Sequence, residues 1–431
     1  APFLGAAAQR GYLVQGGGTT YLAAAVQGND LEPALQTITE ELRRVRLYGF
    51  TSTELDRARS DALASFRQLF NQRGDFPSTN LADELIRYVT LNEAAPGIAH
   101  EWALRQRLIP DYSLEEINLL ADDYLRSDSR VIAAQFIERA DLTPVSEAGL
   151  RSALAEALAA NITPYEDQVV DRPLMPEIPE PGSVVSEDFD EDSGVHIWQL
   201  SNGAELWIRP TDFRPDEVLF SASSPGGTSL MADDQWRSGE TALTFLSQSG
   251  LSDFTRQELQ RLLAGQNVAV SPYISRYEEG LNGSSDLQGL ETMFQLSYLW
   301  FTDPRLDEDA VQRGFEQLEA SVQNRENDPQ EQYFSRVQEI LASGNPRTEA
   351  LELSDFDSID PELGLQLYQE RFANAGDFSF LIVGDVDLDQ IRSLAETYIA
   401  ALPDNGVREE AGDIGIERPT SQVNVTVRVG I

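Results

Sequence analysis

The chain of 431 residues contains no cysteine and no lysine. Without cysteine it can have no disulfide framework, no thiolate nucleophile and no cysteine-based metal site. All 32 basic residues are therefore arginines, and they stand against 72 aspartates and glutamates, for a formal net charge of -40. A charge of this sign and size excludes an electrostatic grip on nucleic acid or on anionic lipid and favours cationic partners.

The absence of lysine indicates adaptation to a salty habitat before it indicates a function. Concentrated salt shortens the Debye length to about 3 Å at 1 M, and an acidic, lysine-free surface keeps a protein hydrated there. The composition therefore favours an acidic, halophilic protein over one with a dedicated acidic binding face. An acidic face that attracts basic peptides remains the alternative.

Long apolar runs are also missing. None approaches the roughly 20 residues that span a bilayer, and the first residues, 1–5, carry no basic or signal-like segment. We therefore expect a soluble chain without membrane insertion that begins abruptly. With 41% hydrophobic residues it is long enough to bury two sizeable cores.

Histidine, the usual zinc ligand, occurs only twice. His100 has no second histidine four residues further on, and His196 opens an expected strand beside an acidic run. We interpret both as ordinary polar residues and not as metal ligands. Residues 385–396 place carboxylates at some positions of a calcium loop, but Gln390 stands where glycine is required, so Asp387 is expected to be a helix N-cap. Without lysine, a Walker-type phosphate-binding loop is excluded.

The clearest boundary in the sequence is a stretch rich in proline and acid at 164–194. Such a composition favours an extended, semi-rigid interdomain linker. It separates a first domain at 1–163 from a second at 195–404. The remainder, 405–431, reads as a linker followed by a strand at 422–429 that opens a further, truncated domain.

The two domains repeat one plan. In the first, helices are predicted at 31–48, from 52 onward, around 81–89, from 114 to about 125 and at 147–159, with a strand at 130–137 before the last helix. In the second, the corresponding helices are predicted at 287–301, 308–322, around 334–340, 361–372 and 388–401, with a strand at 378–383. Each domain opens with strand signals, at 11–26 and 196–209, and the second adds 218–223, 268–275 and 278–285. Strands first and helices after predict an α+β fold, an antiparallel-dominated sheet with helices packed on one face.

Several short patterns, in order, resemble one family. Residues 3–6, 40–58, 82–85 and 96–98 resemble the second domain of the insulinase/pitrilysin/processing-peptidase metallopeptidases, the inverzincins. Residues 200–203, 224–228 and 380–387 resemble the domain that opens each half of these enzymes. The resemblance covers nearly the whole chain and implies two homologous processing-peptidase-like domains.

Family members carry an inverted zinc motif, H-x-x-E-H, in their first domain, with a distal glutamate further along. By hydrophobic register the equivalent window here is 244–248, where Thr244, Ser247 and Gln248 replace the three functional residues, and Ala320 stands near the distal position. The resemblance therefore implies that 195–404 is the third, non-catalytic domain and 1–163 the N-terminally truncated second domain. We assign no catalytic and no metal residue to this chain, and its substrate-binding residues are unknown.

The resemblance implies a zinc-dependent endopeptidase whose absent first domain binds the zinc and whose middle portion, this chain, forms the wall of a chamber that encloses peptides. The portion alone is expected to be inactive. The alternative is a catalytically dead peptide-binding or scaffold subunit. Expected partners are a peptide or unfolded polypeptide, the missing first and fourth domains, and a second copy in a homodimer, but not nucleic acid. A periplasmic location is the expectation for a bacterial protein.

Overall fold

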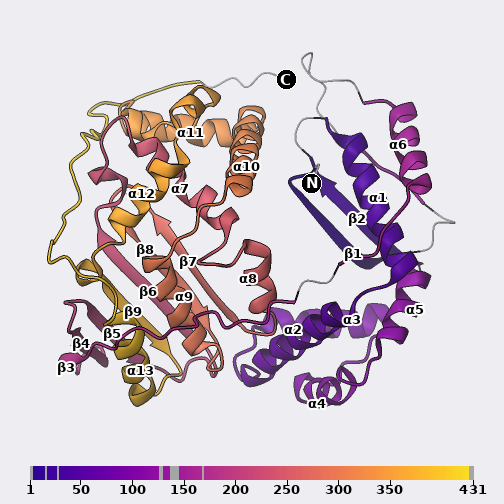
Figure 1. Ribbon diagram of the computed structural model, residues 1–431, viewed down its shortest axis with the longest axis horizontal. Helices are drawn as coiled ribbons and strands as arrows, with labels where there is room; N and C mark the ends of the chain where they lie inside the picture. The colour runs from indigo at the N-terminus through magenta and orange to yellow at the C-terminus, as the bar shows by residue number, and fades with distance from the viewer. Residues whose placement is uncertain are drawn as a thin grey trace. The chain divides into compact units, whose positions relative to one another are not determined.

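The computed structural model describes residues 3–14, 17–26, 29–125, 130–135, 145–166 and 169–426. The chain divides into two compact units (Figure 1). The first consists of Ala1–Phe70 and Phe76–Val169, and the second of Asn71–Asp75 and Val170–Ile431. Each unit is described by itself below.

The first unit opens with an antiparallel pair of strands, β1 (Gly5–Val14) and β2 (Gly17–Ala25). Helices follow: α1 (Leu31–Tyr48), α2 (Ser52–Asn71), α3 (Ser78–Leu91), α4 (Ile98–Leu108), α5 (Leu114–Tyr124) and α6 (Glu147–Ala159). The predicted helices at 31–48 and 147–159 are confirmed to the residue.

Local capping chemistry explains where these helices begin. At α5 the Ser113 hydroxyl accepts from the backbone N–H of Glu116, and the Glu116 carboxylate accepts from the backbone N–H of Ser113. The same reciprocal pair joins Thr51 and Glu54 at the start of α2. Each pair satisfies two backbone donors that a helix N-terminus otherwise leaves unpaired.

Helix α1 packs against α6. The guanidinium of Arg43 donates to the carbonyl oxygens of Ala157 and Ala160 at the end of α6, the latter at 2.8 Å. The Tyr48 hydroxyl donates to the Ile162 carbonyl at 2.6 Å. Side chains of α1 thus satisfy carbonyls at the C-terminus of α6 that have no partner within the helix.

The second unit is built on a seven-stranded sheet in the order β3-β4-β5-β9-β6-β8-β7 (Figure 1). Only β5 and β9 run parallel, and every other neighbouring pair is antiparallel. The strands are β3 (Val184–Asp190), β4 (Val195–Leu200), β5 (Glu205–Pro210), β6 (Val218–Pro225), β7 (Val268–Ile274), β8 (Glu278–Ser285) and β9 (Ser379–Gly384).

Helices cover one face of this sheet. Along β6 the buried residues Val218, Phe220 and Ala222 alternate with the half-exposed Leu219 and Ser221, as expected for a sheet with one packed face. The helices are α7 (Trp236–Ser249), α8 (Arg256–Leu262), α9 (Leu290–Thr302), α10 (Glu308–Asn327), α11 (Pro329–Leu341), α12 (Pro361–Arg371) and α13 (Leu388–Leu394), and a short turn η1 (Gly227–Leu230) follows β6. The α+β prediction is confirmed.

Three predicted elements differ from the structure. Residues 130–135 form no strand, and 136 and 137 lie outside the described residues. Residues 422–426 are likewise not in a strand, and the rest of the predicted 422–429 strand lies outside the described part. In the stretch expected to be a linker, Val184–Asp190 form β3, because all of its residues except Val185, where the register shifts, pair with β4. Acidic composition alone therefore did not distinguish an edge strand from a linker.

Candidate functional site: helix α7 and the free edge of β7

Helix α7 carries the residues that occupy the predicted zinc-motif positions. Phe245 and Leu246 are buried in the core, whereas Thr244 and Gln248 are half-buried and Ser247 is exposed. The amide nitrogen of Gln248 donates to the side-chain oxygen of Gln317 at 2.7 Å, and its amide oxygen accepts from Arg256. Gln248 therefore ties α7 to α10 through a neutral hydrogen bond and to α8 through a hydrogen bond from a charged guanidinium.

The α10 residue that meets this window is Gln317, three residues before the position expected from the sequence. Ala320 itself is buried with 8% of its surface exposed. Sequence reasoning placed the right helix beside the window but missed this residue. A glutamine on α10 opposite another on α7 was the available signal.

The residues present do not fit a zinc ion. Zinc in proteins is held by imidazole, thiolate or carboxylate groups. The window offers two hydroxyls and a glutamine whose amide is already bonded on both sides. Across the described parts of the chain, no group of three or more His, Cys, Asp or Glu residues is arranged to hold a metal ion. No catalytic step can be derived from this helix.

Strand β7 lies at one end of the sheet order and contacts α7. Of the described strands, it pairs only with β8. The backbone N–H of Asp286 donates to the Asn267 carbonyl at 3.0 Å, and that of Ser275 donates to the Glu278 carbonyl at 2.7 Å. Since an antiparallel ladder alternates by residue, the odd-numbered residues between these two points direct their N–H and C=O groups toward β8.

The even-numbered residues of β7 consequently turn their backbone groups to the free edge. Val268, Val270 and Ile274 each present an N–H and a C=O there, whereas Pro272 presents only a C=O. Proline inside a strand is tolerated where the missing N–H faces away from the sheet. Pro272 is even-numbered, so its missing N–H lies on the free edge, in agreement with the hydrogen bonds to β8. It also interrupts the row of outward N–H donors near one end of the strand.

The side chains of β7 divide between the two sheet faces. Val268, Val270 and Ile274 pack against the core on the helix-covered face. Ser271 and Tyr273 alternate with them and belong to the opposite face. Burial, followed by the charges of Glu278 and Glu279, raises the pKa of Tyr273 to about 12, so its phenol is a neutral hydrogen-bonding group at ordinary pH. This edge can accept an extended peptide as an added strand.

The two histidines lie apart from this site. His100 is exposed on α4. His196 is the second residue of β4, half-buried, with its ring centroid 4.7 Å from that of Phe189. Phe189 on neighbouring β3 covers one side of the His196 ring.

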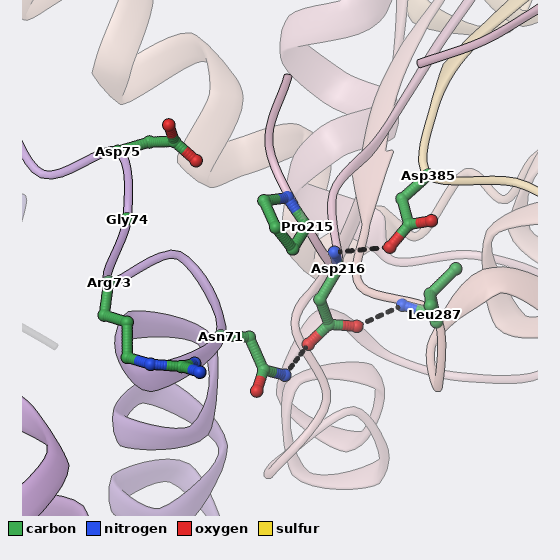
Figure 2. Close-up of a pocket in the computed structure, with 8 residues that line it drawn as sticks. All are labelled: Asn71, Arg73, Gly74, Asp75, Pro215, Asp216, Leu287 and Asp385. Atoms are coloured by element: carbon green, nitrogen blue, oxygen red, sulfur yellow. Dashed lines mark hydrogen bonds between the residues drawn. The ribbon is translucent and has the colours of Figure 1, made fainter. Parts of the chain in front are cut away.

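The acidic residues of the rejected calcium loop serve as caps. Asp387 accepts from the backbone N–H of Gln390 at 3.0 Å and caps α13, as predicted. Asp385 accepts from the backbone N–H of Asp216, and Asp216 accepts from that of Leu287, both at 3.0 Å (Figure 2). Asp216 has φ of 60°, a left-handed conformation that aspartate tolerates better than most residues. These carboxylates are engaged with backbone donors and fix loop ends.

None of the described helices combines the length and the apolar character needed to cross a membrane. The fold of the second unit is a two-layer α+β arrangement, and the side chains at 244–248 on α7 offer no set of zinc ligands.

Comparison with known proteins finds zinc proteases. The chain is 25% identical over 368 residues to a zinc protease PQQL-like protein of Arabidopsis thaliana, which covers 84% of this chain and 35% of that protein. It is 21% identical over 417 residues to the probable zinc protease PqqL of Escherichia coli K12, covering 93% of this chain and 43% of that one. No family model matches. The chain is thus similar over most of its length to zinc proteases, in agreement with the resemblance to the insulinase/pitrilysin family.

Solved structures agree on the fold. The ferredoxin protease FusC in complex with Arabidopsis ferredoxin superposes with a TM-score of 0.58 at 16% identity, over 95% of this chain and 45% of that one. The periplasmic protease PqqL from Escherichia coli superposes with a TM-score of 0.54 at 18% identity, over 100% of this chain and 47% of that one. The chain thus spans less than half the length of these curated relatives and structures.

Proposed function

We propose that this chain is a non-catalytic middle portion of a zinc endopeptidase, and that its second unit binds peptide backbone along the free edge of β7. The observation that carries the proposal is the row of outward N–H and C=O groups on β7, next to the helix that replaces the metal helix. Relatives named as zinc proteases support peptides as the ligand class.

The zinc and the chemistry are assigned to a part of the protein outside this chain. In this proposal 1–163 is the second domain of the first half, 195–404 is the third domain, and 405–431 leads into a fourth. Gln248 supports the non-catalytic assignment of the third domain, since an amide engaged by Gln317 and Arg256 stands at the position of a zinc ligand. This chain alone then hydrolyses no peptide bond.

The charge of the chain suggests which peptides bind. A net charge of -40 attracts basic segments at low ionic strength and loses that attraction as salt screens it. The backbone ladder along β7 is insensitive to side-chain charge. Basic peptides are therefore preferred in dilute buffer, and the preference narrows in concentrated salt. The periplasmic relative of Escherichia coli supports the periplasm as the compartment.

Two proline substitutions test the β7 edge. Val270→Pro removes an N–H that faces outward, and Ser271→Pro removes one that faces β8. We expect Val270→Pro to keep the fold and to weaken binding of a fluorescein-labelled arginine-rich unfolded peptide, measured by anisotropy, by about tenfold, the effect of roughly one to two net hydrogen bonds. Ser271→Pro should lower stability instead, because it breaks the existing ladder.

Unchanged peptide affinity in a folded Val270→Pro variant would exclude the β7 edge. The catalytic half of the proposal is tested separately by zinc stoichiometry and peptide hydrolysis of this chain and of the protein with its upstream sequence. Metal and activity that appear only with the upstream part support the endopeptidase. Their absence from both leaves the scaffold subunit as the function, with peptide binding at β7 unaffected.

A further inference from the structure

An extended segment near the end of the described chain is fastened to the second unit. We call residues 407–414 the C-terminal strap. The Glu409 carboxylate accepts two hydrogen bonds from the Arg371 guanidinium, at 2.7 and 3.2 Å, and the Glu409 backbone N–H donates to Asp377 at 3.0 Å. Further along, the Gly412 N–H donates to the Ser229 hydroxyl at 2.8 Å. The strap is thus held by α12 and by the η1 turn.

A fully buried carboxyl group lies close to these anchors. Glu279 on β8 is 0% exposed, and one of its oxygens accepts from the backbone N–H of Gly227. Its other oxygen has no hydrogen-bond partner among the described residues. A Cβ on Gly226 would stand 3.1 Å from a guanidinium nitrogen of Arg371 and 3.2 Å from Glu279, so the turn brings both groups to one place.

The charges around Glu279 do not balance. Arg371 on α12 is the cation that acts on it, whereas Glu409 of the strap and Asp377 before β9 add negative charge. Ile274 is the strand partner of Glu279 on β7, and Tyr273 beside it projects from the opposite face as a neutral phenol. The partner of Glu279 on β6 is Ser224, whose hydroxyl donates to Asp377. Three carboxyl groups therefore share one guanidinium when Glu279 is charged.

We propose that Glu279 is a proton-operated latch for the C-terminal strap: the neutral carboxyl lets Glu409 dock on Arg371, and the charged carboxylate loosens it. Docking brings the negative charge of Glu409 toward Glu279, so docking and protonation favour each other by thermodynamic linkage. Release would detach residues 407–414 from α12, from Asp377 and from the η1 turn.

The carboxyl group of Glu279 titrates close to neutral pH. Burial, opposed by the Gly227 hydrogen bond and the Arg371 charge and assisted by Glu409 and Asp377, raises the pKa of Glu279 to about 7. The folded-state pKa lies above the ordinary value of 4.5, so the stabilisation is present at acid pH and is lost as pH rises through 7. The strap is therefore docked in mild acid and loosened in mild base. The latch does not depend on the proposed peptidase function.

Hydrogen exchange measures the latch directly. We would determine protection factors, corrected for intrinsic exchange, for the amides of Glu409 and Gly412 between about pH 5.5 and pH 8.5, a window that brackets the titration. In the unaltered chain the protection should fall several-fold across this range. In Glu279→Gln, which is neutral at every pH, it should stay at its acid value throughout.

Two further variants complete the test. Glu409→Gln removes the strap charge that opposes charged Glu279, so the pH response should shrink. Glu187→Gln removes an exposed carboxylate of β3 that pairs with Arg392 at 2.6 Å, and it should leave the response unchanged. A full pH response in Glu279→Gln, or no response in the unaltered chain, would overturn the latch. If Glu279→Gln does not fold by circular dichroism, an unchanged response in Glu409→Gln overturns it instead.

Discussion

The two units share one order of elements, but the second buries more of its side chains than the first. In the second, α9 buries eight residues, among them Phe294, Trp300 and Phe301, between the sheet and its neighbours. Its counterpart α1 in the first unit buries only Ala34 and Thr39. Strand β9 lies between β5 and β6, whereas 130–135, its counterpart, forms no strand.

The difference separates local from tertiary causes. The helix caps form equally in both units because their hydrogen bonds involve residues three apart. A strand needs a neighbour on at least one side, and the described residues of the first unit include no counterparts of β5 and β6. The first unit is therefore expected to be the less stable one.

Core truncation at equivalent positions should give the largest contrast. Phe380 of β9 is 0% exposed, with ring centroids of Phe220, Phe301 and Phe378 at 6.0 to 6.2 Å. We expect Phe380→Ala to cost about 3–5 kcal/mol of unfolding free energy, because a buried ring leaves a cavity. Ile132→Ala, at the corresponding place in the first unit with 40% exposure, should cost less than about 1 kcal/mol.

Urea unfolding followed by hydrogen exchange, with peptides resolved by mass spectrometry, assigns each loss to its unit. Equal losses at the two positions would show that 130–135 packs as β9 does, and the comparison would fail. If Ile132→Ala costs more unfolding free energy in a protein that includes the upstream sequence, that sequence supplies strand partners for 130–135.

Proton linkage should act in opposite directions at Glu279 in the second unit and at Glu116 in the first. Burial raises the pKa of Glu279 to about 7, so the second unit should lose on the order of 3 kcal/mol between about pH 4.5 and pH 7. Hydrogen bonds from Ser113 lower the pKa of Glu116 in the first unit, so its contribution is present above the ordinary value of 4.5 and is lost as pH falls.

Stability against urea, measured across this pH range with unit-resolved hydrogen exchange, checks both signs. Glu279→Gln should flatten the dependence in the second unit, and Glu116→Gln should flatten the acid loss in the first. If neither variant flattens the pH dependence of stability in its unit, the opposite contributions assigned to Glu279 and Glu116 are contradicted.

Much of the fold could be predicted because it rests on local signals. Periodicity and caps gave α1, α6 and β8 to the residue, and the repeat of elements revealed the duplication. The strand at 130–137 was predicted from its place in the repeated order of elements, which says nothing about available partners. The acidic β3 was taken as part of a linker from its composition, although β4 pairs with all of its residues except Val185.

The site was less accessible to sequence reasoning. The sequence showed that 244–248 holds no histidine or glutamate, but the contact of Gln248 with Gln317 depends on how α7 and α10 cross. Pro272 inside a predicted strand was a signal for the sheet edge that the sequence offered. Glu279 reads as one more acidic residue in a chain with 72 of them, and only tertiary burial makes it different.

Substitution of N-cap residues should test whether a helix cap contributes the same free energy in both units. Ser113→Ala at α5 and Thr255→Ala at α8 each remove the hydroxyl of a complete capping box. We expect each to cost about 1 kcal/mol, the usual value for a lost N-cap. The measurement is the local opening free energy from hydrogen exchange of the first helical turn. Costs that differ by more than twofold would mean that tertiary packing also shapes these helix ends.

Exposed ion pairs should have the smallest effect, and equally so in both units. Arg151 pairs with Glu147 at 2.6 Å in the first unit, with side chains 76% and 79% exposed, and Arg214 pairs with Glu217 at 3.2 Å in the second. Replacing either arginine by alanine should change unfolding free energy by less than about 0.5 kcal/mol, since water screens the pair. Salt acts differently, because the net charge of -40 repels itself throughout the chain. Raising salt to about 1 M should therefore stabilise both units and both variants alike. A loss of stability in salt would show that individual pairs outweigh the collective repulsion and would contradict the halophilic interpretation of the composition.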